Sequence, residues 1–162
     1  MKRFVPRPPA SLLPPALAVL VLMALLAGAC AKPAAEVPPG DLMQLDELAA
    51  VITDSTAVQP ILLHIGFEPL YRSGRIPGSR FVGPGNKPEG LAALKAALAE
   101  APRDRAVVLY CGCCPWNDCP NVRPAYEVAK ASGHPNVKLL YVTGNLERDW
   151  IQKGLPAAKG GD

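Results

Sequence analysis

Four cysteine residues are concentrated in one short stretch of the sequence, and they are the residues best suited to chemistry. The stretch reads Cys-Gly-Cys-Cys-Pro-Trp-Asn-Asp-Cys, and its thiols are Cys111, Cys113, Cys114 and Cys119. A thiolate is a strong nucleophile and a good ligand for soft metal ions, and two thiols can form a disulfide. The spacing therefore permits nucleophilic group transfer, redox exchange, or binding of copper(I) or zinc.

Each of these alternatives uses the cysteines differently. Cys111 and Cys114 form a C-x-x-C pair after an apolar run, which is the placement of a thioredoxin-like redox pair. All four thiols can instead be ligands of one soft metal ion, although zinc sites commonly divide their ligands between two separated pairs. In a third interpretation, Cys113, Cys114 or Cys119 forms a structural disulfide or resolves an intermediate on Cys111. The cysteine pattern leaves these alternatives open.

The sequence before the cysteines favours Cys111 as the nucleophile. Residues 106–110 (Ala-Val-Val-Leu-Tyr) are apolar throughout, which predicts a buried strand that ends directly before Cys111. A helix with alanine and valine on one side follows the loop. Backbone N–H groups at a strand-to-helix loop favour an anion, so we expect Cys111 to have a lowered pKa. Cys119 is the competing nucleophile, because it lies close to the start of the helix.

Strands and helices alternate along the rest of the chain. Apolar runs predict two further buried strands, at 60–65 and 137–142. Apolar residues at helical spacing predict helices around 45–52, 91–98 and 146–153, and residues 67–73 are predicted as a short helix or turn. Strands that are apolar throughout indicate a parallel sheet covered on both faces. The predicted fold class is α/β, a single domain with a central parallel sheet and helices on both faces.

The first thirty residues are typical of an export signal. Basic residues precede an uncharged run from Ala16 to Ala27, which is of signal-peptide length and shorter than the roughly 20 residues of a membrane-spanning helix. The run ends in small residues before Cys30, as in the cleavage and acylation site of bacterial lipoproteins; ordinary cleavage near Ala29 is the alternative. We therefore expect lipid attachment at Cys30, and a protein anchored in the cell envelope that faces the periplasm or the exterior.

The remaining chain divides into a tether, a domain and a tail. Residues 31–40 predict a proline-rich tether, residues 41–156 the folded domain, and residues 157–162 a flexible tail. The net charge of +3 comes from three basic residues in the export signal, since the other 14 basic residues balance the 14 acidic ones. We therefore expect no basic face and no nucleic-acid partner.

Three stretches of the domain resemble the rhodanese family of sulfurtransferases. Residues 62–79, which end in Ile-Pro-Gly-Ser, are similar to the family's first signature. Residues 107–111 are similar to the strand that delivers its nucleophile, and residues 137–156 to its closing strand and Gly…Trp…Gly-x-Pro motif. The resemblance covers nearly all of residues 41–156. It implies a thiosulfate-type sulfurtransferase, in which Cys111 takes a sulfane sulfur from a small donor and passes it as a persulfide to a thiol acceptor.

The resemblance implies roles for other residues and no cofactor. Loop amides, including that of Gly112, and the cations Arg75 and Arg123 are expected to hold an anionic donor; the alternative for each arginine is a solvated surface charge. The redox or resolving thiols are Cys113, Cys114 and Cys119. No metal is assigned in this interpretation, and metal ligation by Cys111, Cys113, Cys114 and Cys119 is its alternative.

The sequence also departs from the family's pattern. His64 and Gly66 stand where the family usually has aspartate and arginine, Arg75 replaces its signature histidine, and the catalytic loop is longer. Two functions from other classes follow: a non-enzymatic metal- or thiol-binding module, and a silent fold that binds a partner. We interpret His64 as a core histidine, Asn121 as a helix cap, and Trp116 as a lid or a packing residue.

Overall fold

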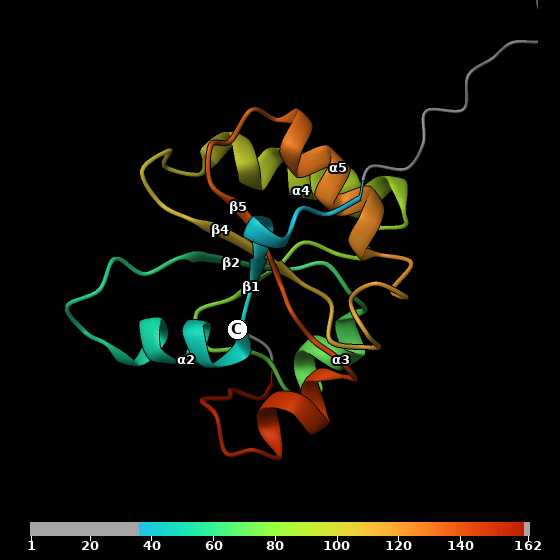
Figure 1. Cartoon of the computed structure of the whole chain (residues 1–162). Helices are drawn as coiled ribbons and strands as arrows, with labels where there is room; N and C mark the ends of the chain where they lie inside the picture. Colours follow the sequence, from blue (N-terminus) through green and yellow to red (C-terminus); the bar gives the residue numbers. More distant parts are fainter. Residues whose placement is uncertain (1–35, 161–162) are drawn as a thin grey trace, which may run out of the picture. The chain divides into compact units, whose positions relative to one another are not determined.

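The computed structural model describes residues 36–160 (Figure 1). The predicted signal with Cys30, most of the tether and the last two residues of the tail lie outside this range. The elements in chain order are η1 (Pro39–Asp41), β1 (Leu42–Met43), α2 (Leu45–Thr53), β2 (Ile61–His64), α3 (Glu68–Ser73), β3 (Arg80–Phe81), α4 (Pro88–Glu100), β4 (Val107–Tyr110), α5 (Val122–Ala131), β5 (Val137–Leu140) and η2 (Glu147–Ile151).

The described strands form one five-stranded sheet with the order β1-β5-β4-β2-β3, and every pairing is parallel. Helices α4 and α5 cover one face, and α2 lies on the other (Figure 1). The apolar residues of β4 alternate between these faces, with Val107 and Leu109 in the core under α4 and α5. Val108 and Tyr110 belong to the opposite core, which includes the fully buried Trp150. The predicted α/β fold is therefore confirmed.

The parallel arrangement brings the ends of the central strands to one edge of the sheet. His64, the last residue of β2, is paired in register with Tyr110, the last residue of β4. Leu109 is paired with Leu139 of β5 in the same way. Loops that follow the carboxyl ends of parallel strands are the usual place for a binding site. The cysteine-rich loop, which follows Tyr110, lies at this edge.

Two features of the sheet and helices differ from the sequence prediction. The edge strands β1 and β3 were not predicted, because strands of two residues are too short to show a periodic pattern. The last predicted helix is a π-helical turn, η2.

Part of the predicted tail, up to residue 160, is described in the structure and makes backbone hydrogen bonds. Ala158 forms an antiparallel bridge with Arg75, and the N–H of Gly160 donates to the carbonyl of Arg72. Residues 158–160 are therefore held by backbone hydrogen bonds that no apolar pattern signals.

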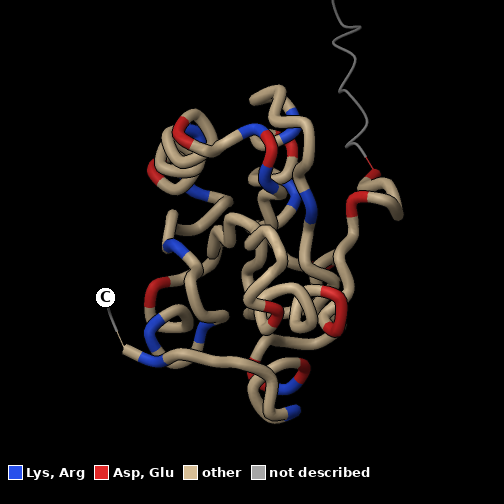
Figure 2. Tube along the Cα trace, turned by 90° about the vertical axis from the view of Figure 1, so that its left-hand side faces the viewer, with Lys and Arg blue, Asp and Glu red and all other residues tan. Residues whose placement is uncertain are grey.

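Charged residues are distributed around the domain. Lys and Arg are interspersed with Asp and Glu on the side drawn in Figure 2, in agreement with the balanced charge of the sequence. In residues 36–160, no helix combines the length and the apolar character that crossing a bilayer requires.

Candidate thiol site at the carboxyl end of the sheet

Cys111 lies at the point where β4 ends, and 3% of it is exposed. The chain turns sharply at the next residue, Gly112, whose φ of +82° is in the left-handed region that favours glycine. A Cβ at Gly112 would lie 2.8 Å from the Cβ of Leu146, whose N–H donates to the Gly112 carbonyl at 3.0 Å. The turn therefore requires glycine, and it directs the following cysteines back toward Cys111.

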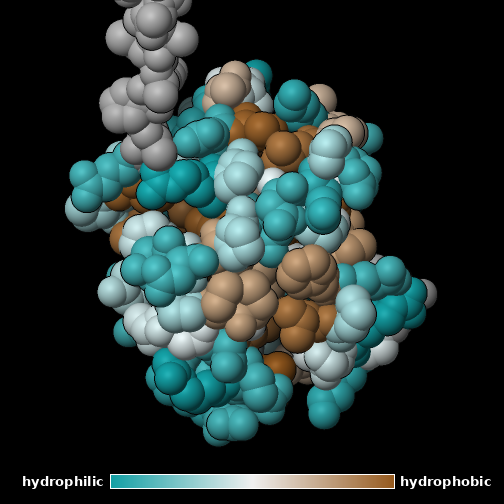
Figure 3. Space-filling model, turned by 90° about the vertical axis from the view of Figure 1, so that its right-hand side faces the viewer, coloured by the Kyte–Doolittle hydropathy of each residue, from teal (hydrophilic) through white to brown (hydrophobic). Residues whose placement is uncertain are grey.

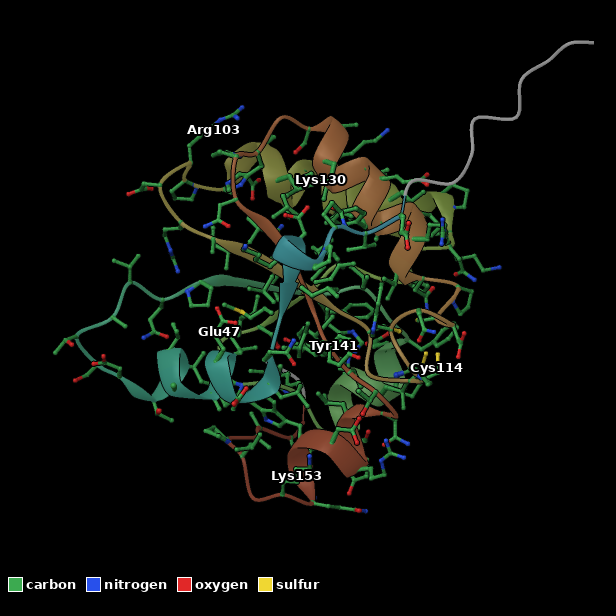
Figure 4. All side chains as sticks on the ribbon, in the orientation of Figure 1. Glu47, Arg103, Cys114, Lys130, Tyr141 and Lys153 are labelled. Atoms are coloured by element: carbon green, nitrogen blue, oxygen red, sulfur yellow. The ribbon has the colours of Figure 1, made fainter. Side chains whose placement is uncertain are left out.

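The four sulfur atoms lie together at this turn. The Sγ atom of Cys113 lies 3.3 Å from that of Cys111, 2.9 Å from that of Cys114 and 3.5 Å from that of Cys119. None of these described thiols is in a disulfide. Cys111 and Cys119 are buried, whereas Cys113 and Cys114 are partly exposed. Figure 4 labels Cys114 on this loop. The structure thus brings together the four thiols that the sequence selects.

Asn121 is a residue of this site that the sequence interpretation missed. It precedes α5, but its side chain makes no capping hydrogen bond. Its Nδ2 instead donates to Cys111 Sγ at 3.3 Å, and its Oδ1 accepts from the N–H of Asn86 at 3.2 Å. Asn121 is fully buried, so these bonds fix its orientation. A buried amide that donates to a sulfur stabilises negative charge on that sulfur.

The expected lowering of a cysteine pKa occurs at Cys119 and not at Cys111. The pKa of Cys119 is lowered to about 5, chiefly by its hydrogen bond with Cys111 and also by the N–H of Asn121. The pKa of Cys111 is raised, because its thiol donates a hydrogen bond to Cys119 and because it is buried. Burial also raises the pKa of Cys114. The expectation failed because the backbone N–H of Asn121, directly before α5, donates to the sulfur of Cys119 and not to that of Cys111. The thiol of Cys111 is buried and keeps its proton.

A pocket of about 210 Å³ opens beside the cysteines. It is lined by Cys111 and Cys113, on the side of the domain where Cys114 is labelled in Figure 4, and apolar side chains reach the surface in several patches on the side drawn in Figure 3. Among the described residues that line it, Glu147 is the acidic one and none is Lys or Arg. The lining residues are His64, Leu70, Ser73, Gly74, Cys111, Gly112, Cys113, Asn145, Leu146, Glu147 and Ile151.

The structure does not bring the two predicted arginines to this pocket. Arg75 is 8% exposed, and its guanidinium donates to the carbonyl of Gly160 and lies 4.8 Å from the centre of the Tyr71 ring. Arg123 is an exposed residue in the first turn of α5. Gly112, the third residue expected to bind substrate, does line the pocket. The bound position of Arg75 depends on a chain segment 85 residues away, which no local motif reveals.

His64 and Gly66 lie beside Cys111 at the carboxyl end of β2. His64 is 1% exposed, and burial lowers the pKa of its imidazole to about 4, so the ring is neutral at pH 7. Its Nδ1 accepts from the N–H of Gly66 at 3.3 Å, which agrees with the expected core histidine. A Cβ at Gly66 would lie 2.9 Å from Cys111 Sγ. Glycine is therefore needed here because the backbone passes directly against the sulfur.

Trp116 and Asp149 fix the loops around the pocket. The Trp116 ring lies 6.1 Å from that of Tyr141, and the backbone N–H of Trp116 donates to the Val142 carbonyl. Trp116 therefore packs beside the end of β5 and does not line the pocket. Asp149 is buried and accepts from the N–H of Thr143 at 3.0 Å and from that of Gly144 at 2.6 Å. These bonds hold the loop that supplies Asn145 and Leu146 to the pocket wall.

Comparisons with known proteins agree with the geometry at the level of the fold. No protein-family model matches the sequence, and no curated protein matches it significantly. Among solved structures, the BH2092 protein of Bacillus halodurans is 18% identical with a TM-score of 0.55, and the alignment covers 90% of this chain and 87% of that chain. A full-length protein of Lactobacillus plantarum is 14% identical with a TM-score of 0.56, covering 90% and 98% of the two chains.

A third similar structure is a rhodanese-like domain. The rhodanese-like domain of the Anabaena protein Alr3790 is 15% identical, with a TM-score of 0.52, and the alignment covers 74% of this chain and 79% of that domain. The resemblance drawn from residues 62–79, 107–111 and 137–156 is thus confirmed for the fold. The domain that the structure describes has the fold of rhodanese-like proteins.

Proposed function

We propose that the protein is a sulfurtransferase that carries sulfane sulfur as a persulfide on Cys111. The observation that supports this most directly is the position of Cys111, directly after the central strand β4 and on the wall of the pocket. The rhodanese-like fold and the cluster of thiols are compatible with this activity. Asn121 adds an N–H donor to the same sulfur.

The first step loads the sulfur. Cys111 first loses its proton to water, and the amide of Asn121, 3.3 Å from its sulfur, stabilises the thiolate that forms. The Cys111 thiolate then attacks the outer sulfur of a donor in the pocket. A bond forms between Cys111 Sγ and that sulfur, while the bond from that sulfur to the rest of the donor breaks, and the donor's remainder leaves with the electron pair. Asn121 remains in place to donate to Cys111 Sγ.

The second step passes the sulfur on. An acceptor thiolate attacks the terminal sulfur of the persulfide, and the electron pair of the broken S–S bond returns to Cys111, which takes back a proton. Cys113 offers a second route, because its sulfur lies 3.3 Å from Cys111 Sγ. Attack by the Cys113 thiolate on Cys111 Sγ forms a disulfide between them and releases hydrosulfide. Cys113 is thus the resolving thiol in the absence of an acceptor.

The pocket favours a donor with little negative charge. Glu147 is exposed and lines the pocket, and a sphere of 210 Å³ is about 7 Å across. Two unit charges at that separation repel by about 0.6 kcal/mol in water, so a dianion such as thiosulfate is disfavoured by about 1 kcal/mol. A small alkyl persulfide carries at most one charge. We therefore propose persulfides as the donor class in place of the thiosulfate that the resemblance implies.

The proposed setting is the cell envelope. The basic start of the chain, its apolar run and the small residues before Cys30 support export and lipid attachment at that cysteine. The sulfur donor and the thiol acceptor would then meet the domain outside the cytoplasm, where the domain would be held at the membrane by its lipid.

Intact mass and transfer rate test the proposal. Reduced full-length protein with Cys30→Ser is treated with thiosulfate or with an alkyl persulfide, and one added sulfur atom is expected. Cys111→Ser should abolish loading and transfer, whereas Cys113→Ser and Cys114→Ser, the matched controls, should keep a measurable fraction. Loading that survives Cys111→Ser and is lost in Cys119→Ser overturns the assignment, and no loading in the reduced parent overturns the activity.

Glu147→Gln tests the donor class separately. It removes the charge and keeps the shape of the side chain, so transfer from thiosulfate should rise about fivefold, as expected from about 1 kcal/mol. Transfer from the alkyl persulfide should change far less. Equal changes for both donors would contradict the electrostatic argument and leave the role of Cys111 intact.

A further inference from the structure

We infer that Cys111, Cys113 and Cys119 form a three-coordinate site for copper(I). Their three sulfur atoms all lie within 4.8 Å of one another, with Cys113 at 3.3 Å from Cys111 and at 3.5 Å from Cys119. Within residues 36–160 these residues form the group of side chains that is close enough to hold one ion. The inference concerns binding of a metal ion and does not depend on sulfur transfer.

The spacing of the sulfurs fits a metal ion. With metal–sulfur bonds of about 2.3 Å, three sulfurs in a plane around one ion lie about 4.0 Å apart. The Sγ atom of Cys113 lies slightly closer than this to the Sγ atoms of Cys111 and Cys119, at 3.3 and 3.5 Å. The Sγ atoms of Cys111 and Cys119 lie within 4.8 Å of each other. Shifts of well under an ångström in each side chain would therefore place all three sulfurs around a central ion.

The number and type of ligands favour copper(I) over zinc. All the nearby donors are soft thiol sulfurs, which select copper(I). Structural zinc sites take four ligands in a tetrahedron, with sulfurs about 3.8 Å apart. Cys114 lies 2.9 Å from Cys113, but it is outside the group in which every sulfur is within 4.8 Å of every other. The fourth corner of a tetrahedron is therefore not in place.

The surroundings allow an ion to enter and hold it in a shielded position. Cys113 is partly exposed and lines the pocket, whereas Cys111 and Cys119 are buried. A copper(I) ion delivered through the pocket would meet Cys113 first and then bind the two inner sulfurs. Binding displaces the thiol protons to solvent and changes no oxidation state. Because Cys111 would be a ligand, a bound ion and a persulfide exclude each other.

Competition for copper(I) tests the site directly. The reduced full-length protein with Cys30→Ser, which keeps the four cluster thiols and no other, is titrated without oxygen against the chelator bicinchoninate. We expect one copper(I) per chain, three sulfur ligands by X-ray absorption, and weaker competition by zinc(II). Cys113→Ser should lower the affinity at least about 100-fold, by analogy with the loss of other metal-site groups. The matched variant Cys114→Ser should change it less than about threefold, well under 1 kcal/mol.

Two results would overturn the inference. One is the absence of retained copper(I) in the parent protein, and the other is equal weakening by Cys113→Ser and Cys114→Ser, which would indicate four ligands. Both are measured without a sulfur donor. A failed copper site therefore leaves the sulfurtransferase proposal unaffected, and a failed sulfurtransferase leaves the copper site unaffected.

Discussion

Replacing Asn121 by aspartate should nearly abolish the reactivity of Cys111 while leaving the fold intact. Aspartate has the same shape and keeps the Oδ1 atom that accepts from the N–H of Asn86 at 3.2 Å. In place of the amide that donates to Cys111 Sγ at 3.3 Å, it presents a carboxylate oxygen. A stabilising contact for the thiolate thereby becomes a repulsive one.

The expected size follows from that distance. Two negative charges 3.3 Å apart repel by about 5 kcal/mol at an effective dielectric constant of about 20. The lost hydrogen bond to a charged sulfur adds about 1.5–3 kcal/mol. Taking the repulsion alone and allowing for partial relaxation, we expect at least a ~1,000-fold slower reaction of Cys111. Asn121→Ala loses the hydrogen bond without adding a charge, so it should be slower by only about 10- to 100-fold.

The rate of alkylation measures this effect. Reduced proteins with Cys30→Ser are treated with iodoacetamide at one fixed pH, and the modification of Cys111 is followed by mass spectrometry of its peptide. Melting curves by circular dichroism show whether the variants keep their fold. If Asn121→Asp reacts within about threefold of Asn121→Ala, a difference of less than 1 kcal/mol, the contact between the amide and the sulfur does not control Cys111 and the reasoning is refuted.

Three further predictions concern the packing, the pocket wall and the export signal. Gly66→Ala should destabilise the domain by about 1–3 kcal/mol in urea and slow alkylation of Cys111, because the new Cβ would lie 2.9 Å from that sulfur; Gly40→Ala, where nothing lies within 4 Å, is the control and should leave both unchanged. The pKa of Asp149 is lowered from 3.8 to about 2, chiefly by its hydrogen bond with Arg148. The ionised carboxylate therefore adds about 1–2 kcal/mol to the free energy of unfolding above pH 3.8, and this contribution is lost as the pH falls through 2. Asp149→Asn should remove this pH dependence of stability from urea unfolding measured across that range, and an unchanged pH dependence would contradict the assignment. Cys30→Ser should move the protein from the membrane to the soluble fraction of expressing cells, and an equal distribution of both forms would exclude lipid attachment there.

The interior of the fold was predictable because burial leaves a periodic or continuous apolar pattern. Residues 106–110 are apolar throughout, and this is the strand that both layers of helices cover in the structure. The edge strands β1 and β3 contain two residues each and are held by backbone pairing with β5 and β2. Backbone hydrogen bonds do not depend on the side chain, so such strands leave no signal in the sequence.

The site was predictable in its residues and not in its contacts. The four cysteines fall within nine residues, but nine extended residues span up to about 30 Å, so the contacts between their sulfurs depend on how the loop folds back. The roles of Arg75 and Asn121 depend on partners distant in the chain, namely Gly160 and Asn86. The position of Cys119 relative to the α5 start likewise depends on how the loop folds back. A closer signal was available at Asn121, a short amide placed directly between the cysteines and a helix.

The bridge between Arg75 and Ala158 has a consequence for the order in which the domain can mature. The ribosome synthesises Ala158 after every element of the sheet, and Ala158 closes onto the segment next to Ser73 and Gly74 in the pocket wall. The nascent chain therefore presents its four thiols before this wall can be tied in place. A modification or metal ion captured at Cys113 before the bridge forms would meet an incomplete pocket, so the order in which the segments fold would influence the chemical state of the cluster.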